Sequence, residues 1–211
     1  MASSAVAYRK CCAFAYVYLC VVGVVIYSIF DGDNADDFYL DQNTGLMTTQ
    51  VVLDREVVEE YFFTIYAIDQ ASSPKTGTTL IRVVVDDVND HDPIINHESY
   101  IGAVQEVAEV GTRVMYIRAS DEDTGENGRL TYSITSGNED GMFQIDSVRG
   151  EVTLKSQVDR EAKATYSLVI RVTDNGSPAK FATTEATVKV VDNNDNAPVF
   201  ENSNYEFEVG M

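Results

Sequence analysis

Acidic and amide side chains that could hold a hard cation are concentrated in two short segments of this chain. Residues 87–93 (DVNDHDP) have a counterpart in residues 192–198 (DNNDNAP), which begin 105 positions later. Calcium prefers six to eight oxygen ligands, and short Asp and Asn side chains supply such oxygens at little cost in conformational entropy. The closing proline has no N–H and restrains the preceding residue to an extended conformation. We therefore expect each segment to place cation ligands at a boundary between domains.

Other residues recur with the same offset of 105, which indicates a tandem repeat of domain size. The pairs are Asp54-Arg55-Glu56 with Asp159-Arg160-Glu161, Asp69 with Asp174, Tyr61 with Tyr166, Tyr100 with Tyr205, Phe38 with Phe143, Asp41 with Asp146, and Gly45 with Gly150. We divide the chain accordingly into a divergent apolar N-terminus (1–22), an N-terminally truncated repeat (23–95), a complete repeat (96–198) and the first strand of a further, truncated repeat (199–211).

Composition excludes some classes of partner. The net charge of −19 and the pI near 4.2 argue against nucleic acid and anionic lipid, whose phosphates attract Lys and Arg. All three cysteines lie within the first twenty residues, so no disulfide can stabilise the repeats. The acids form short motifs rather than one run, which favours divalent cations over a disordered acidic tail.

The N-terminus contains an uncharged run from Cys11 to Phe30. On length alone it could be the hydrophobic part of a signal peptide or a signal anchor that crosses the membrane. Its last third is also in register with a strand of the second repeat, so an unrelated start joined to a truncated repeat is a third interpretation. All three stay open from the sequence.

From residue 23 onward the sequence predicts an all-β protein. Segments 61–69 and 78–86 are rich in β-branched and aromatic residues. In the complete repeat, seven strands are expected at 100–107, 113–119, 128–135, 143–146, 151–155, 166–173 and 184–191, which is typical of an immunoglobulin-like β-sandwich. Leu168, Ile170 and Val172 should face one side of their strand. Residues 205–209 should begin a third unit, and Phe38, Phe143, Tyr66 and Tyr132 should be core residues.

The motifs of the second repeat resemble those of a cadherin extracellular repeat. The similarity extends from about residue 23 to the end and depends on residues 100–106, 121–128, 159–161 and 173–174 and on both copies of the linker. The resemblance implies tandem Greek-key β-sandwiches whose joints bind calcium, three ions at each complete joint. In an extended chain, residues two apart share a face, so Asp54 with Glu56 and Asp121 with Asp123 should point together.

The resemblance also implies two sets of calcium ligands. The first comprises Asp54, Glu56, Asp87, Asn89, Asp90, His91 (through its carbonyl), Asp121, Asp123, Asn127 (through its carbonyl) and Asp174. The second comprises Glu106, Asp159, Glu161, Asp192, Asn194, Asp195 and Asn196.

Three departures from the pattern bear on these sets. By offset, Met1 stands where Glu106 should have its counterpart, so the first joint lacks a bridging carboxylate. Tyr16, Tyr18 and Val22 replace the residues equivalent to Asp121, Asp123 and Asn127, which leaves Asp69 without companions. The second set lacks the residues that a third repeat would contribute.

Several polar residues have both a structural and a functional interpretation. We interpret His91 and His97 as solvated loop residues, with a pH-sensitive or metal-binding role for His91 as the alternative. Arg55 and Arg160 should be surface or strand-packing residues, although they could screen the acids. Asn175-Gly176-Ser177 is a glycosylation sequon on an expected turn.

The resemblance predicts calcium-dependent cell–cell adhesion, homophilic or heterophilic, at the extracellular face of the plasma membrane. The expected partners are calcium ions and another cadherin ectodomain on an apposed cell, with membrane association through the parent protein or the apolar N-terminus. Tryptophan is absent, and the pattern is closer to Fat-like or protocadherin-like members. The alternative is a non-adhesive spacer or a fragment of a signalling receptor ectodomain that binds calcium.

The residues argue against two other functional classes, an EF-hand calcium sensor and a metal-dependent hydrolase. The loop at Asp121 is not an EF-hand, because Gly125 and Glu126 occupy its fifth and sixth positions and Tyr132 stands where the closing glutamate belongs. A metal-dependent hydrolase would need an open coordination position and a base beside a pocket, which the motifs do not supply. We therefore expect no enzyme.

Overall fold

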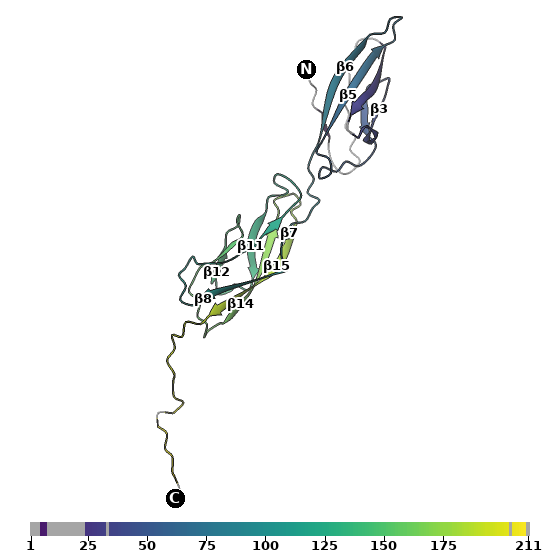
Figure 1. Cartoon of the computed structure of the whole chain (residues 1–211). Helices are drawn as coiled ribbons and strands as arrows, with labels where there is room; N and C mark the ends of the chain where they lie inside the picture. Colours follow the sequence, from purple (N-terminus) through teal and green to yellow (C-terminus); the bar gives the residue numbers. More distant parts are fainter. Residues whose placement is uncertain (1–4, 8–23, 33, 203, 210–211) are drawn as a thin grey trace. The chain divides into compact units, whose positions relative to one another are not determined.

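The computed structural model describes residues 5–7, 24–32, 34–202 and 204–209, and within these its regular secondary structure is β-strand apart from one 3-10 turn (Figure 1). The chain divides into two compact units. The first contains the described residues up to Asp92 together with segments 121–129 and 174–180, and the second contains the rest. Two loops of the second sequence repeat therefore belong to the first compact unit, a division that differs from the predicted boundary after residue 95.

The first unit contains a four-stranded sheet and a short two-stranded one. The large sheet has the order β1 (Ala5–Ala7), β6 (Thr76–Val85), β5 (Glu60–Asp69) and β2 (Val25–Gly32), and the small one pairs β3 (Phe38–Leu40) with β4 (Met47–Thr49). A 3-10 turn, Ala35–Asp37, precedes β3. The two sheets share one core, to which Phe38 and Met47 contribute from the small sheet and Phe63 and Ile65 from the large one.

The first unit contains a strand that the sequence did not predict. β1 runs parallel to β6 and pairs Ala7 with Val85. In the second unit β8 (Ser99–Gln105) runs parallel to β15 (Phe181–Val191) and pairs Val104 with Val190 in the same way. The boundary at residue 23 therefore leaves out a strand of the first sheet, and the strand pairing aligns Ala7, not a residue near Met1, with the end of β8.

The last part of the uncharged N-terminal run also belongs to this sheet. β2 starts at Val25 and pairs with β5, so a membrane helix that continued to Phe30 is excluded. Residues 11–23 lie outside the described part of the chain. Among the described residues no helix is long and apolar enough to cross a membrane.

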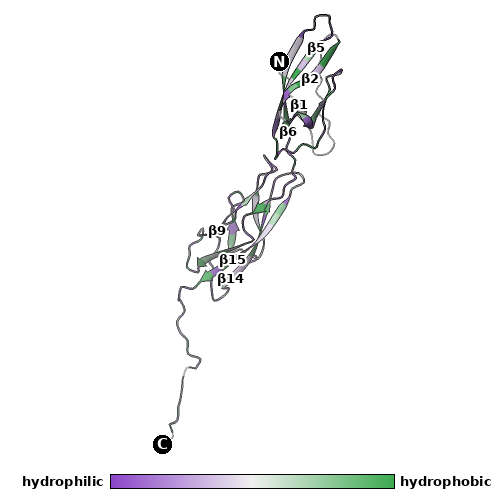
Figure 2. Ribbon diagram, turned by 45° about the vertical axis from the view of Figure 1, so that its right-hand side comes forward, coloured by the Kyte–Doolittle hydropathy of each residue, from purple (hydrophilic) through white to green (hydrophobic). Residues whose placement is uncertain are grey.

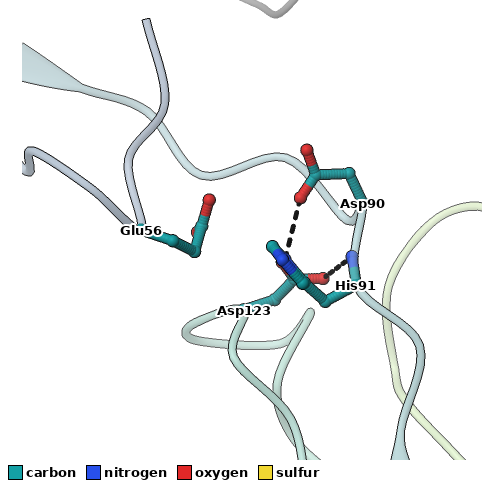
Figure 3. A group of neighbouring side chains, drawn as sticks. All are labelled: Glu56, Asp90, His91 and Asp123. Carbon is teal, nitrogen blue, oxygen red and sulfur yellow. Dashed lines mark hydrogen bonds and ion pairs between the residues drawn. The ribbon is translucent and has the colours of Figure 1, made fainter.

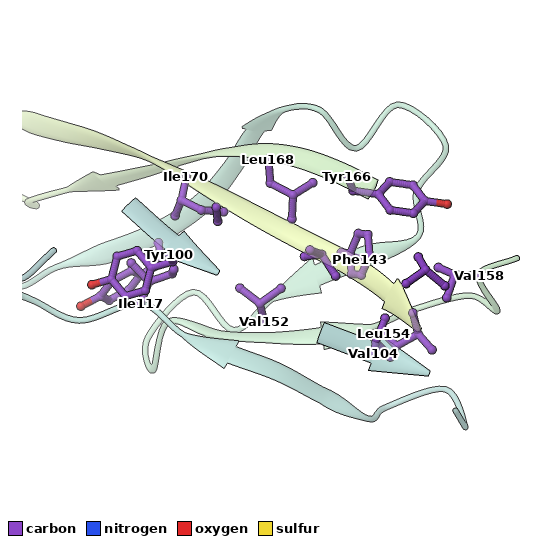
Figure 4. Packing of buried hydrophobic residues seen from close by; sticks show 14 of the residues in the cluster. Tyr100, Val104, Ile117, Phe143, Val152, Leu154, Val158, Tyr166, Leu168 and Ile170 are labelled. Carbon is purple, nitrogen blue, oxygen red and sulfur yellow. The ribbon is translucent and has the colours of Figure 1, made fainter. Parts of the chain in front are cut away.

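The second unit is a sandwich of a four-stranded and a three-stranded sheet, which confirms the seven predicted strands. The first sheet has the order β11 (Thr131–Ser136), β14 (Thr165–Thr173), β15, β8, and the second has the order β12 (Phe143–Ile145), β13 (Glu151–Leu154), β9 (Arg113–Tyr116). A short ladder pairs β7 (Ile94–Ile95) with β10 (Ala119–Ser120). Leu168, Ile170 and Val172 are fully buried, as their alternation predicts. Leu168 and Ile170 lie with Phe143 in the core between the sheets (Figure 4).

The repeated Asp41 and Asp146 are turn residues rather than cation ligands. Asp146 Oδ1 accepts the backbone N–H groups of Val148 and Arg149, and Asp41 Oδ1 accepts those of Asn43 and Thr44. These hydrogen bonds lower the pKa of both carboxyl groups. Each turn connects the two strands of a hairpin, β3 with β4 and β12 with β13.

The strands of both units contain hydrophilic and hydrophobic residues (Figure 2), but the outward face of the large sheet differs in character between the units. In the first unit Phe62 and Leu80 are exposed and Phe30 stacks on Tyr66 with ring centroids 4.5 Å apart. The prediction that Tyr66 is a core residue is therefore wrong, because Tyr61, Phe63 and Ile65 fill the inner face of β5. Ser167, Arg171, Glu185 and Thr135 occupy the corresponding positions of the second unit.

The expected first strand of a further repeat is not formed. Residues 204–209 have no strand assignment, and Phe207 and Val209 are exposed. A strand needs a neighbour to accept its hydrogen bonds, and the described residues offer none there.

Candidate metal centre

The linker after β6 is hydrogen-bonded to both loops of the first unit that come from the second repeat. Asp87 Oδ2 accepts hydrogen bonds from the Thr124 N–H at 3.1 Å and from Asn127 Nδ2 at 2.9 Å. Asn89 Nδ2 donates to Asp174 Oδ2 at 3.1 Å and to the Pro178 carbonyl at 2.7 Å. The predicted ligands at 87–90 therefore lie beside those at 121–127 and at 174.

Two glycines allow these close approaches. A Cβ on Gly176 would lie 2.2 Å from Asn89 Nδ2, and a Cβ on Gly128 would lie 2.0 Å from the carbonyl oxygen of Asp123. The second contact is with backbone, which cannot rotate away. Glycine at 128 is therefore required for the fold of the loop that carries Asp121 and Asp123.

The paired acids lie in turns and not in extended strands, so that part of the prediction is wrong. Asp54 Oδ1 accepts the N–H of Glu56 at 3.1 Å, and Asp121 Oδ1 accepts the N–H of Asp123 at 3.0 Å. Asp and Asn side chains commonly close such turns by bonding a backbone N–H two residues ahead. The turn directs one carboxylate oxygen of each leading Asp toward its own backbone.

Several oxygens of this cluster are buried and accept no hydrogen bond. They are Glu56 Oε1, Asp87 Oδ1, Asn89 Oδ1 and Asp121 Oδ2. A buried polar atom without a partner costs about 1–3 kcal/mol, and more when the group is charged. Four oxygens in one region, on residues from three segments, are the donor set that a hard cation would satisfy. The residues therefore fit calcium.

Burial and mutual repulsion perturb the acids of the cluster. Burial raises the pKa of the Asp121 carboxyl, and the negative charges of Asp123 and Asp174 act in the same direction. Burial also raises the pKa of Glu56. Both shifts disfavour the charged form of these carboxyl groups, so the folded protein holds them as anions at a cost.

His91 lies in a loop with its side chain 34% exposed, but it makes close contacts that the expectation of a solvated residue did not include. Its backbone N–H donates to Asp123 Oδ2 at 3.1 Å, and its ring Nδ1 lies 3.0 Å from Asp123 Oδ1 and 3.0 Å from Asp90 Oδ1 (Figure 3). The hydrogen bond to Asp123 raises the pKa of His91. His97, by contrast, is exposed and packs edge-on against Tyr100.

Arg55 also departs from the expectation of a surface residue. Its side chain is only 11% exposed, and Nε lies 3.3 Å from Asp87 Oδ1 and 3.8 Å from Glu56 Oε1. Arg160, its counterpart in the second repeat, is 43% exposed and pairs with Glu161. Arg55 therefore provides part of the positive charge next to the cluster.

Two residues beside the cluster had no signal in the sequence. Lys180 Nζ donates to the Asp90 carbonyl at 2.9 Å and pairs with Asp92 at 3.0 Å. Glu122 Oε2 lies 3.4 Å from His91 Nε2. Only the folding of the two loops brings these side chains to the linker.

The second predicted set is only partly brought together. Carboxylate oxygens of Glu106, Glu161 and Asp195 lie within 4.8 Å of one another. Glu106 is buried and accepts the N–H groups of Arg160 at 3.1 Å and Asn193 at 2.6 Å. Asp159 and Asp192 instead accept nearby backbone N–H groups, and Asn196 donates to Asp195. The set is exposed apart from Glu106.

The strand pairing changes which residue of the first repeat corresponds to Glu106. Since Ala7 pairs as Val104 does, residue 9 follows Ala7 by two positions as Glu106 follows Val104. In the sequence this residue is Arg9, which lies outside the described residues, as do Met1, Tyr16, Tyr18 and Val22. The alignment with Met1 is therefore wrong, but the replacement is again not a carboxylate.

Asn175, the acceptor of the sequon, is part of the same loop. Its Nδ2 donates to the Arg129 carbonyl at 2.7 Å, and its N–H donates to the Glu126 carbonyl at 3.2 Å. Glycosylation at this residue stays a prediction.

Comparison with curated proteins finds relatives that are much longer than this chain. The chain is 36% identical over 181 residues to Protocadherin Fat 1 of Homo sapiens, 39% identical over 189 residues to Cadherin-23 of Rattus norvegicus, and 40% identical over 180 residues to Protocadherin-16 of Mus musculus. These alignments cover 86%, 87% and 85% of this chain but only 4%, 6% and 5% of the relatives' own lengths.

Among solved structures, human CDH23 EC21-23 superimposes with a TM-score of 0.78 at 27% identity, covering 99% of this chain and 79% of that one. Protocadherin Gamma B2 extracellular cadherin domains 3-6 gives a TM-score of 0.74 at 26% identity over 80% of this chain and 43% of that one. The family model of the cadherin domain matches residues 19–86 and 100–191. The strand pairing, the linker motifs and these matches together show that the chain belongs to the cadherin family, a family of adhesion proteins and not of enzymes.

Proposed function

We propose that this chain binds calcium through the acidic cluster of its first unit and serves in calcium-dependent recognition between cells as part of a longer cadherin ectodomain. The observation that carries the proposal is the group of buried oxygens that accept no hydrogen bond: Glu56 Oε1, Asp87 Oδ1, Asn89 Oδ1 and Asp121 Oδ2. The proposed ligands are the ten residues of the first predicted set, which come from the 54–56 turn, the 87–91 linker and the two loops at 121–127 and 174.

The expected effect of calcium follows from the charges. Without a cation the carboxylates of Asp121, Asp123 and Asp174 repel one another, which adds to the effect of burial in raising the pKa of Asp121. A bound calcium ion supplies positive charge that offsets this repulsion. The chain's own residues then hold the 121–129 and 174–180 loops against the linker through the hydrogen bonds of Asp87 and Asn89.

Thermal unfolding in a calcium titration tests the binding step. For an extracellular module we expect half-saturation at roughly 10⁻⁴–10⁻³ M. One ion at ten times its Kd adds about 1.4 kcal/mol of stability, which for a unit of this size raises Tm by several degrees. Asp123→Asn should blunt the response, because its carboxylate is fully buried beside His91.

Glu126→Gln is the matched control. It lies in the same loop, but its side chain is exposed and pairs with Arg129 rather than with the cluster. Equal calcium responses of the wild type and Asp123→Asn would contradict the proposed site. A response lost equally in Asp123→Asn and Glu126→Gln would indicate a nonspecific effect of charge.

A second experiment tests recognition itself. Beads coated with the chain, or mixed with beads that carry a longer relative, should aggregate in calcium and disperse in chelator. Calcium binding without aggregation would support the alternative of a spacer or receptor fragment. The wider activity belongs to the whole protein, since this chain spans 4–6% of the relatives compared above.

A further inference from the structure

The first unit contains a nitrogen ligand that a calcium site does not use. His91 Nδ1 lies 3.0 Å from Asp90 Oδ1 and 3.0 Å from Asp123 Oδ1, and one oxygen of Glu56 lies within 4.8 Å of the other three ligand atoms (Figure 3). Calcium takes oxygen ligands, whereas imidazole nitrogen suits zinc, copper, nickel and iron. The ring of His91 thus changes the chemistry of the cluster.

Two carboxylate oxygens, from Asp90 and Asp123, face the single ring nitrogen Nδ1 of His91, which is one acceptor more than a simple hydrogen bond needs. A ring nitrogen carries at most one proton, yet two carboxylate oxygens lie at the same distance from Nδ1. Metal–ligand distances of about 2.0–2.2 Å put neighbouring ligands about 2.8–3.1 Å apart in octahedral geometry and about 3.3–3.6 Å apart in tetrahedral geometry. The two observed N···O separations of 3.0 Å match the octahedral spacing.

Buried oxygens of two carboxylates also point to a cation at the same place. Glu56 Oε1 is buried and accepts no hydrogen bond. The guanidinium of Arg55 approaches it only to 3.8 Å, at Nε. The carboxylate of Asp123 is fully buried, so its charge needs a partner within the protein or a bound ion.

We propose that Glu56, Asp90, His91 and Asp123 form a site for a borderline divalent transition metal such as zinc. His91 would bind through Nδ1 and the three acids through one oxygen each. The second group, Glu106, Glu161 and Asp195, offers no nitrogen, because Asn196 stands where His91 does. The same chain therefore contains a natural comparison for the effect of the imidazole.

Zinc chloride alone is the probe, titrated by calorimetry into the full chain and into His91→Asn, which copies Asn196. We expect the variant to bind zinc at least tenfold more weakly at this site or to lose one equivalent. Both proteins keep Cys11, Cys12 and Cys20, so any zinc held by cysteine cancels in the comparison. His97→Asn, which changes the exposed histidine, should bind zinc like the wild type.

The imidazole signals provide a second readout. The chain has two histidines, so its proton NMR spectrum should contain two ring Hε1 signals. Zinc should shift the signal that is missing in His91→Asn and leave that of His97 in place. Calcium titration of the same two proteins tests the proposed function separately. His91→Asn should bind calcium like the wild type, because the variant retains every oxygen ligand.

Equal zinc binding by the wild type and His91→Asn would overturn the proposal. So would an NMR titration in which zinc and calcium move the His91 signal alike, because the ring would then respond only to neutralisation of the acids. In either case the imidazole would act merely as a counter-ion to Asp90 and Asp123.

Discussion

Asn89 Nδ2 donates a hydrogen bond of 3.1 Å to Asp174 Oδ2, although the two residues are 85 positions apart in the chain. The amide thus separates a buried carboxylate from the acids of the linker and supplies a proton that another carboxylate could not. A neutral side chain in the middle of the acidic cluster should therefore affect the stability of the first unit.

Asn89→Asp should therefore destabilise the first unit in calcium-free buffer. The change removes a hydrogen bond and places a negative charge against Asp174, which we expect to cost about 1–3 kcal/mol. Added calcium should recover most of the loss, because the new carboxylate is itself a calcium ligand. Urea unfolding with and without calcium measures both effects. Asn202→Asp, in the exposed C-terminal segment, is the control, and an equal loss in both variants would refute the explanation.

The stability of the cation-free protein should rise as the pH is lowered from about 8 to about 5. The pKa values of His91, Glu56 and Asp121 are raised in the fold, by the hydrogen bond to Asp123 for His91 and by burial for the two acids. A group with a raised pKa stabilises the fold below its unfolded pKa and loses that contribution as the pH rises through the folded pKa. His91, which faces Asp90, Asp123, Glu122 and Glu56, governs the upper part of this range.

Calorimetric Tm values across this range provide the measurement. His91→Asn should flatten the curve above about pH 6, because among the side chains of the cluster only the imidazole has an ordinary pKa in that range. Below about pH 4 the trend should reverse, because the lowered pKa values of Asp41 and Asp146 make their protonation destabilising. A wild-type Tm that falls steadily from pH 8 to 5 would show that the cluster is not repulsive.

Gly128→Ala should distort the loop that carries Asp121 and Asp123. The new Cβ would lie 2.0 Å from the Asp123 carbonyl oxygen, so the backbone has to move. We expect a loss of roughly 2–4 kcal/mol and a weaker calcium response. Gly77→Ala, whose Cβ would have ordinary contact distances, should stay within about 1 kcal/mol of the wild type. Similar effects of the two changes would argue against the steric explanation.

Leu168→Ala tests the core of the second unit. Leu168 is fully buried among residues from both sheets, so the cavity should cost about 2–5 kcal/mol. Val148→Ala, at a side chain that is 78% exposed, should change the free energy of unfolding by less than about 0.5 kcal/mol. Chemical denaturation in calcium measures both variants. A loss below about 1 kcal/mol for Leu168→Ala would mean that the sheets close around the gap.

The sequence predicted the second unit well because its signals are local. Period-two alternation places Leu168, Ile170 and Val172 on one face, and the recurring Asp146 and Gly150 mark a hairpin turn. The same reasoning failed at Tyr66, since β5 has large apolar residues on both faces and alternation then identifies no buried side.

The sequence predicted which residues form the candidate site but not how their side chains are arranged. The spacing of the motifs identified the acids, yet it could not show that Asp54 and Asp121 close turns. The burial of Arg55 and the ring position of His91 depend on side chains that are distant in sequence. β1 was missed because the 105-residue offset does not hold upstream of residue 23.

The parallel pairing of β1 with β6 bears on where the protein can be shortened. A recombinant version starting at residue 24 would lack Ala5–Ala7 and leave the backbone N–H and C=O groups of β6 at residues 83–85 without their partner. Such an uncapped edge offers a template to any other extended chain. The N-terminal boundary chosen for expression should therefore decide whether the first unit stays monomeric in solution.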